Sequence, residues 1–449
     1  MTTNMIDKLE SKLSALDPVV RAEALQQLAQ LAQAGAIDLA PEADVVNMHC
    51  HTFFSFNALG YSPTALAWLG RRQGFELMGI VDFDMLDGVD EFLAACQIVG
   101  LRGTAGIESR VFVPEYAAQE INSPGEPGVC YHMGLGFASS AVPEAVAPIL
   151  ANLSQRTDQR NRGILARVNR YLDPVTIDYE RDVLPLTPSG HPTERHLVVA
   201  YIQAAKRTLA DPASFWAERL GVAPTQMAAL TQDSAQFQNL IRTRLMKHGG
   251  VGYVQPGSGM FPTIDQFQHL VVACGALPCA AWLDGTSPTE QAIEEWLGFL
   301  IDKGVVALNI IPDRNWNVTD PEVRKLKVRN LYRVVEVAGQ LDLPLNVGTE
   351  MNSFGQKQVD DFDAPALAPL RQAFLDGAYF IYGHTVMQRA LSRGYMSDWA
   401  QTHLPGRRER NDFYRQVGRL VPPGPKGTAQ LQRLQARQSP QEILSALTD

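Results

Sequence analysis

The chain has 449 residues, of which 45% are hydrophobic and 19% are charged. This length allows one large domain with additions or two domains, and the composition lies far from that of disordered proteins. The formal net charge of −9 excludes a broad cationic surface and argues against general nucleic-acid binding, although a local pocket of arginines can still hold a small anionic substrate.

Cysteine usage and the hydrophobic runs indicate the compartment. The five cysteines include no CxxC pair, which favours reduced thiols and a cytoplasmic protein. The first residues, MTTNMIDKLESKLSALD, are charged and amphipathic and lack the apolar core of a signal peptide. No apolar run approaches the roughly 20 residues that span a bilayer, so we expect no membrane association. These features leave the oligomeric state open.

In chain order, a helical segment comes first. Residues 5–36 carry leucines and alanines at helical spacing, and we assign residues 1–42 to an N-terminal helical extension. Short β-rich segments then recur, most of them followed by a helical pattern: DVVNMHCH, ELMGIVDFD, RGTAGIESRVF, GVCYHMGLGF, ALPCAAWLDG, VVALNIIPD, LPLNVGTE and AYFIYGHT. Strands that alternate with helices predict a parallel sheet or a β/α barrel, here over residues 43–420.

Two regions depart from this alternation. Residues 141–247 are rich in Ala, Gln, Arg and Leu and predict a helical insertion between barrel strands, a common position for a cap that faces the substrate. The segment VPPGPKG at 421–427 predicts a linker to a C-terminal helix around 428–447, so that residues 421–449 form a C-terminal extension.

Polar residues gather at the C-terminal ends of four β-rich segments: His51, Asp82, Glu350 and His384. In a β/α barrel this end of the strands carries the active site. Ordinary loop polarity explains any one of these residues, but four together favour a site.

The stretch NMHCHTFFSFN places His49 and His51 two positions apart. Alternate residues of a strand face the same side, so both imidazoles point one way. In a chain with nine histidines this pair is a weak signal alone, and Glu108 strengthens it because a buried carboxylate is costly unless a cation meets it. His132 is either a further ligand or a hydrogen-bonded core histidine. Imidazoles with carboxylates suit Zn, Mn or Fe better than Ca.

The order of these motifs resembles the polymerase and histidinol phosphatase (PHP) family over about residues 45–355. The matching segments are NMHCHTFFSFNALG, VDFD, GIES, HMGLGF, TERH, AAWLDG and the EMN of residues 350–352. The resemblance implies a distorted β/α barrel of about seven strands, up to three divalent metals, and hydrolysis of phosphoesters.

The resemblance also implies which metal ligands remain. The positions of the third-metal ligands hold Asn57, Phe83 and Asn352. None of these is the residue type that binds the metal in the family. Trp282 stands where a histidine of the second metal is expected. The first site is complete, with Glu in place of the usual Asp, and its ligands are His49, His51, Glu108 and Glu350. We therefore expect one tightly bound divalent metal. The alternative is two metals, the second bound more weakly with His132 as a ligand.

Two polar residues have open roles. Asp82 is either a catalytic base or a hydrogen-bonding partner of a metal-binding histidine. His384 replaces a lost ligand, acts in acid–base catalysis, or caps a turn.

Five residues are candidates for substrate binding: Arg195, His196, Trp282, Arg314 and Lys357. An arginine can clamp a carboxylate or phosphate with two hydrogen bonds, although surface ion pairs are the commoner role of single basic residues. Trp282 either fills the pocket beside His132 or packs on the outward face of its strand, and these alternatives differ by a register of one residue.

These residues favour a metal-dependent hydrolase of PHP type acting on a small anionic substrate, with a phosphoester preferred. One alternative is a mononuclear hydrolase, lyase or isomerase of a carboxylated metabolite. Another is a protein that binds a metal or ligand without catalysis.

Overall fold

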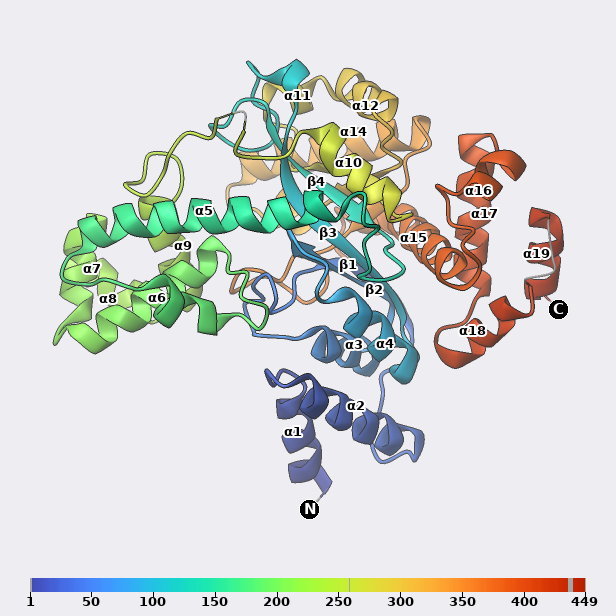
Figure 1. The fold of residues 1–449 in the computed structure, drawn as a ribbon, viewed down its shortest axis with the longest axis horizontal. Helices are drawn as coiled ribbons and strands as arrows, with labels where there is room; N and C mark the ends of the chain where they lie inside the picture. Colours follow the sequence, from blue (N-terminus) through green and yellow to red (C-terminus); the bar gives the residue numbers. More distant parts are fainter. Residues whose placement is uncertain (1, 258, 435–438, 449) are drawn as a thin grey trace.

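The computed structural model describes residues 2–257, 259–434 and 439–448. Seven strands form one sheet that curves into a nearly closed barrel surrounded by helices (Figure 1). The strands are β1 (Ala43–Cys50), β2 (Phe75–Phe83), β3 (Arg102–Phe112), β4 (Val129–Leu135), β5 (Leu277–Trp282), β6 (Ala307–Ile310) and β7 (Leu345–Val347). The expected β/α barrel is thereby confirmed.

The strands follow chain order around the barrel. All neighbouring strands are parallel except β4, which runs antiparallel to both β3 and β5. The ring closes between β1 and the segment after β7, where the His51 N–H donates to the Glu350 carbonyl and the Glu350 N–H donates to the His49 carbonyl, each at 2.7 Å. The C-terminal ends of β1 and β7 therefore meet at the histidine pair.

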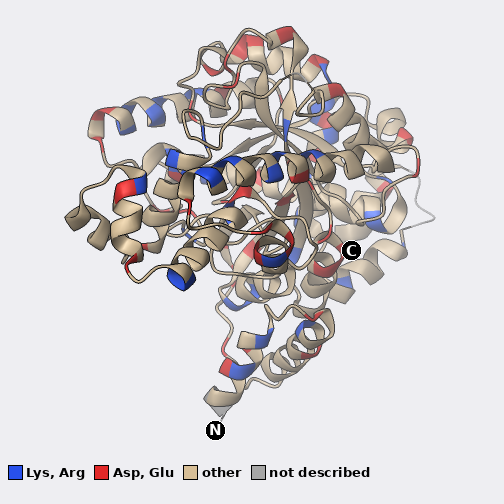
Figure 2. Ribbon diagram, turned by 60° about the vertical axis from the view of Figure 1, so that its left-hand side comes forward, with Lys and Arg blue, Asp and Glu red and all other residues tan. Residues whose placement is uncertain are grey.

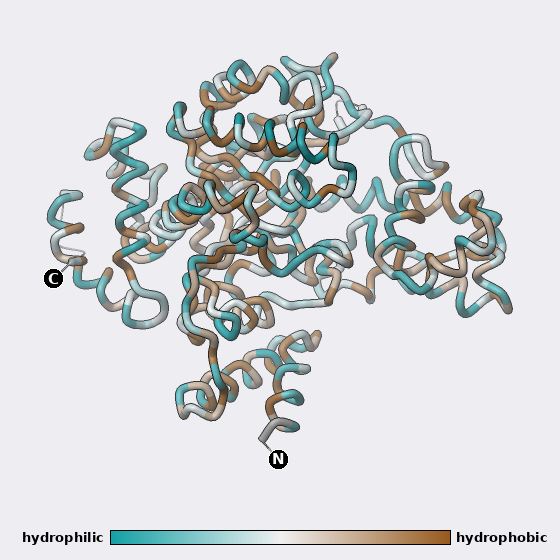
Figure 3. The backbone as a smooth tube through the Cα atoms, turned by 180° about the vertical axis from the view of Figure 1, so that it is seen from behind, coloured by the Kyte–Doolittle hydropathy of each residue, from teal (hydrophilic) through white to brown (hydrophobic). Residues whose placement is uncertain are grey.

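Helices cover the outside of the barrel. They are α3 (Pro63–Arg72), α4 (Val89–Val99), α10 (Ile264–Ala273), α11 (Pro288–Gln291), α12 (Ile293–Asp302), α13 (Asp313–Trp316), α14 (Pro321–Gln340) and α15 (Arg371–Leu391), with 3-10 turns at Pro114–Tyr116 and Ala368–Leu370. Hydrophobic residues concentrate in the barrel, and the outer helices alternate between hydrophobic and hydrophilic turns (Figure 3). In the described part of the chain, no helix has the length and apolar character needed to cross a bilayer.

The insertion between β4 and β5 is helical, as expected. It contains α5 (Ala147–Leu172), α6 (Glu194–Thr208), α7 (Pro212–Leu220), α8 (Pro224–Leu230) and α9 (Ser234–Leu245), with irregular turns at Tyr179–Val183 and Leu184–Leu186. These elements bury their own hydrophobic cluster, which includes Val168, Tyr201 and Trp216. Helix α5 runs from the barrel into the insertion (Figure 1), so the insertion is a second layer with a separate core.

Both ends of the chain are helical. The N-terminal extension contains α1 (Thr2–Lys12) and α2 (Pro18–Gln33), and the C-terminal region contains α16 (Asp398–His403), α17 (Arg407–Leu420), α18 (Gly424–Gln432) and α19 (Pro440–Thr448). Helix α18 begins inside the segment 421–427 that we expected to be a linker. Residues 435–438 of the expected C-terminal helix lie outside the described residues.

The strand expected at AYFIYGHT is wrong, because these residues belong to helix α15. Helix α15 packs against β1 and β7 on one side and against α17 on the other. Gly377 allows close approach to the Leu345 backbone and Gly383 allows close approach to the Tyr414 backbone. Seven of the eight residues of AYFIYGHT are buried in the middle of this helix, so the segment does not show the 3.6-residue period that identifies a surface helix.

Candidate metal centre

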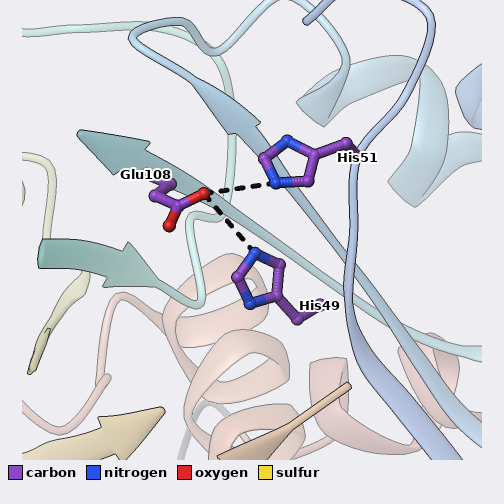
Figure 4. Close-up of side chains that lie close together, drawn as sticks. All are labelled: His49, His51 and Glu108. Atoms are coloured by element: carbon purple, nitrogen blue, oxygen red, sulfur yellow. Dashed lines mark ion pairs between the residues drawn. The ribbon is translucent and has the colours of Figure 1, made fainter. Parts of the chain in front are cut away.

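Three buried side chains converge inside the barrel at its closing edge. His49 and His51 extend from the end of β1 and Glu108 from β3 (Figure 4). The Glu108 Oε2 atom lies 3.6 Å from His49 Nε2 and 3.2 Å from His51 Nε2. All three atoms are buried and have no hydrogen-bond partner among the described residues. Such atoms are costly unless something binds them.

The ring of His49 is oriented by amides on the neighbouring strands. Its Nδ1 lies 3.2 Å from the Oδ1 of Asn309 on β6, and that oxygen also accepts a hydrogen bond from the Asn346 side chain on β7 at 2.9 Å. Because Asn309 Oδ1 can only accept, His49 Nδ1 carries the proton. In the neutral ring the lone pair is therefore on Nε2, the atom that is turned toward Glu108.

The ring of His51 is oriented through Ser55. His51 Nδ1 lies 3.0 Å from Ser55 Oγ, and the Ser55 hydroxyl donates to Asp82 Oδ1 at 2.6 Å. Since the hydroxyl proton is directed at Asp82, Ser55 accepts from His51 Nδ1–H, and the Nε2 lone pair again faces Glu108. The Asp82 carboxylate also accepts from the backbone N–H and the hydroxyl of Thr52. This arrangement supports the second of the two roles considered for Asp82, that of a partner which orients a histidine.

Electrostatics keep the carboxylate ionised. Burial raises the pKa of Glu108, but the adjacent His49 and His51 outweigh this effect and hold the pKa well below its usual value. Burial lowers the pKa of His49, and the nearby carboxylates of Glu108 and Glu350 outweigh it so that the net shift is upward. One carboxylate oxygen and two imidazole nitrogens, all within 4.8 Å of one another, fit a divalent metal that takes mixed N and O ligands.

Glu350 lies beside this group without joining it. Its backbone closes the barrel in the left-handed region at φ 65°. Its Oε2 accepts hydrogen bonds from Arg314 at 2.5 Å and from Gln356 at 3.0 Å. Among the described residues, the converging group contains His49, His51 and Glu108 but not Glu350. The carboxylate expected to complete the first metal site is held by Arg314 instead.

The register of β4 corrects the expectation for His132. In the antiparallel pair β3–β4, Glu108 lies opposite Met133 and Ser109 lies opposite His132. Opposed residues share a face of the sheet, so His132 faces away from Glu108. Its ring packs edge-on against Phe267 of α10, and its Nε2 lies 3.2 Å from the Gln268 side chain. His132 is placed in the outer helix-packing layer, where burial lowers its pKa to about 3.

Trp282 lies on this outer face as well. His132 pairs with Ala280, and the alternation of side chains along β5 puts Trp282 on the same face as Ala280. Ala281 and Leu283 line the cavity in front of Glu108, and Trp282 does not. The expectation that Trp282 fills the pocket is therefore corrected by one residue of register.

The cavity at the barrel mouth lies between the candidate metal centre and the insertion. His51, Glu108 and Glu350 form part of its wall. Six basic residues also line it: Arg110, Arg160, Arg195, Arg242, Lys247 and Arg314. Over the molecule as a whole, basic and acidic residues are interspersed (Figure 2). Asp84, Asp158 and Glu194 line it as well, so the cavity is mixed in charge with a small excess of basic side chains, which suits an anionic ligand.

The other residues expected at the site fall into two groups. Arg195 and Arg314 line the cavity, and Arg195 donates to Asn352 Oδ1 at 3.2 Å. Outside the cavity lining, His196 accepts from the Thr193 N–H and caps α6. Lys357 lies 3.3 Å from Asp313 and sits over the Trp316 ring.

His384 belongs to the second group. It is buried in α15, with Nε2 3.1 Å from the Gly136 carbonyl and Nδ1 accepting from the Tyr395 N–H at 2.9 Å. Both ring nitrogens are thus engaged, and the placement supports a packing role.

Asn57 and Phe83, which stand at two of the third-metal ligand positions, make other contacts. The Asn57 amide donates to the His51 carbonyl at 2.8 Å, and the Phe83 ring stacks on His51 with centroids 5.5 Å apart. Phe83 therefore fills space beside the histidine.

Several residues of the site were not expected from the sequence. Asn309 orients His49, Ser55 orients His51, and Tyr131 and Arg110 lie side by side on the inner face next to Glu108. Arg110 could have been found, since it lies two residues after Glu108 on the same strand and so faces the same side. Tyr131 required the pairing register of β4.

No family model matches the chain, and no curated protein matches it. The chain is similar to a "putative metal-dependent phosphoesterase" from Bifidobacterium adolescentis at 19% identity, over 74% of this chain and 98% of that chain, with a TM-score of 0.47. It is also similar to an amidohydrolase from Chromobacterium violaceum, with bound sulfate and no metal, at 14% identity, over 73% of this chain and 96% of that chain, with a TM-score of 0.48. Neither likeness is strong enough to assign a function.

Proposed function

We propose that the chain is a metal-dependent hydrolase of PHP type that acts on a small anionic substrate, a phosphoester. One observation carries the proposal: three buried atoms of His49, His51 and Glu108 face one another, with no hydrogen-bond partner outside this group among the described residues, at a cavity whose lining includes six basic and five acidic residues. The motif order of the PHP family supports the same reading.

Each part of the site has a separate task. A divalent metal held by His49, His51 and Glu108 would supply Lewis-acid activation of a substrate oxygen and of water. Arg195 and Arg314 face the same cavity and can donate paired hydrogen bonds to an anionic group of the substrate. The apolar residues Phe83 and Met85 also line the cavity.

A second candidate function is a mononuclear hydrolase, lyase or isomerase of a carboxylated metabolite. The observation that favours it is the engagement of the Glu350 carboxylate by Arg314, which leaves a smaller ligand set than a multinuclear phosphatase uses. A carboxylate substrate could replace Glu350 at Arg314 with similar geometry.

Metal analysis and a substrate screen together test the proposal. We expect one tightly bound divalent metal per natively purified chain and hydrolysis of phosphomonoesters or phosphodiesters that is lost on chelation and restored by Zn, Mn or Fe. Arg314→Gln should raise the KM more than it lowers kcat, because Arg314 binds the anion. Arg419→Gln, which breaks a surface ion pair with Asp376, is the matched control.

Two results would contradict the proposed function. Activity only on carboxylated metabolites would favour the second candidate. A protein that binds metal but turns over neither class of substrate would be the non-catalytic binding protein considered from the sequence.

A further inference from the structure

A second cavity adjoins the first on the side of the insertion. Arg110, Arg160, Glu194 and Lys247 line both cavities, and Arg156, from the same helix as Arg160, lines the second. The wall is completed by residues that follow α9, among them Tyr253 and Phe261. The two cavities therefore share part of their walls on the side of α5.

Two arginines of α5 face this space. Arg156 and Arg160 are four residues apart and so lie on one side of the helix. Within the described residues, neither forms an ion pair, and Arg160 donates only to Thr157 Oγ1 at 3.2 Å. The Nη1 atom of Arg156 is buried and has no hydrogen-bond partner there. Both side chains are half-buried, and a partly buried guanidinium group with unmet hydrogen-bonding capacity favours an anion supplied from outside.

The carboxylates near Arg160 are already engaged elsewhere. Asp84 accepts from Ser109 and Thr157, Glu126 accepts from Arg110 and Ser123, and Glu194 pairs with Arg242 and Lys247. Burial, together with the neighbouring Arg110, lowers the pKa of Arg160 to about 10. At neutral pH the group therefore still carries its charge. Among the described residues no carboxylate forms an ion pair with it, and Asp84 is linked to it only through the Thr157 hydroxyl, which accepts from Arg160 and donates to Asp84.

The positions of these guanidinium groups are fixed before any ligand arrives. The Phe261 ring lies 4.5 Å from the Arg110 guanidinium carbon and 5.6 Å from that of Arg160. Stacking on one ring holds planar guanidinium groups while leaving their N–H edges free to donate. Preorganised donors lose little conformational entropy when they bind an anion.

We propose that the second cavity is an anion-binding subsite built by Arg156 and Arg160, and that the substrate is a small molecule with two separate anionic groups. One group lies at the candidate metal centre and the other, a phosphate or a carboxylate, lies against α5. The proposal deepens the proposed function and rests on it for the position of the first group only.

Titration of the metal-loaded full-length chain with inorganic phosphate tests the subsite. By isothermal titration calorimetry, we expect two phosphates per wild-type chain and one in Arg156→Gln/Arg160→Gln, with unchanged metal content. Arg170→Gln, at an exposed position of the same helix, should bind two. Arg160→Lys keeps the charge without the planar fork and should weaken the second phosphate at least tenfold. Equal phosphate binding by the wild type and the double variant would overturn the proposal.

A second titration separates this proposal from the proposed function. His49→Ala/His51→Ala should lose the metal and the phosphate at the metal centre but keep the phosphate against α5. If this variant still binds one phosphate and the wild type shows no hydrolysis, the subsite stands and the proposed function fails. If the variant binds none, the subsite is wrong. Repeating the titration of this variant with malonate identifies the preferred anion. Binding of malonate but not of phosphate at the α5 position indicates a carboxylate, and binding of phosphate but not of malonate indicates a phosphate.

Discussion

Arg314 and Glu350 form an ion pair of 2.5 Å on the wall of the cavity. Arg314 follows β6 and Glu350 follows β7, so the pair joins the ends of two neighbouring strands. The Glu350 carboxylate is thereby kept away from His49 and His51, although the backbone of Glu350 is hydrogen-bonded to both. This relationship separates two carboxylates that motif comparison alone treats as equivalent ligands.

We expect Glu108→Gln and Glu350→Gln to differ sharply in metal content. Glu108→Gln removes the anionic ligand of the converging group, so the purified protein should contain little metal while remaining folded. Glu350→Gln should retain most of the metal, because its carboxylate is held by Arg314. Elemental analysis together with circular dichroism checks both variants. Equal metal loss in the two would show that Glu350 is a ligand of equal weight.

Replacement of Ser55 by Ala should weaken metal binding without removing a ligand. Ser55 holds the proton of His51 on Nδ1 and links the ring to Asp82. Loss of such a partner typically costs about 10–100-fold in metal affinity. Competition with a chromophoric chelator measures the change, and Ser154→Ala, on α5 at the cavity wall, is the control. Unchanged affinity in Ser55→Ala would contradict the orienting role.

The register of β5 predicts opposite results for neighbouring substitutions. Ala281→His places an imidazole on the cavity face, where it can add a nitrogen ligand, whereas Trp282→His places one in the outer packing layer. We expect tighter metal binding in Ala281→His alone and a loss of thermal stability in Trp282→His, since a fully buried indole is removed. Metal titration and thermal unfolding check both. Increased metal uptake by Trp282→His would show that the indole faces the site.

Asp360 should make stability depend on pH. Burial, helped by the charge of Asp313, raises the pKa of Asp360 to about 7. The folded state thus binds this proton more tightly than the unfolded state, so the contribution to stability is complete below about pH 4 and is lost as the pH rises through about 7. Asp360→Asn should therefore gain roughly 1–3 kcal/mol relative to wild type between about pH 5 and pH 8.

Urea unfolding of Asp360→Asn and wild type at about pH 5 and about pH 8 measures this gain in the free energy of unfolding. Asp361→Asn, at an exposed neighbouring position, provides the control and should show no such gain. A constant offset between Asp360→Asn and wild type at both pH values would exclude titration of Asp360 in this range.

The sequence predicts the barrel because seven of the eight β-rich segments form its seven strands. It also predicts the convergence of His49, His51 and Glu108, since they lie on or directly after β1 and on β3, which neighbour β2 in chain order. The eighth segment, AYFIYGHT, predicts a strand but belongs to α15, because the charged residues of that helix lie outside this buried stretch. Short apolar segments of this kind do not distinguish a strand from a buried helix.

The faces of β4 and β5 could not be predicted from the sequence. Most residues of β4 and all residues of β5 are buried, so neither strand shows the alternation that would identify its inner face. A motif alignment assigns His132 and Trp282 to the site by position along the strand, whereas the pairing register decides which side they face. The ion pair of Glu350 depends on a left-handed backbone, which sequence patterns do not indicate for glutamate.

The closure of the ring fixes when the centre can form as the chain folds. The side chain of Asn47, two residues before His49, bonds to Thr349 across a separation of 302 residues, and the hydrogen bonds that pin His49 and His51 to Glu350 span a similar distance. Contacts of such long range carry a large loop-closure cost and form late. During synthesis from the N-terminus, the backbone of the two histidines is fixed only after nearly all of the barrel has been synthesised. A metal bound by His49, His51 and Glu108 would therefore be acquired late in folding.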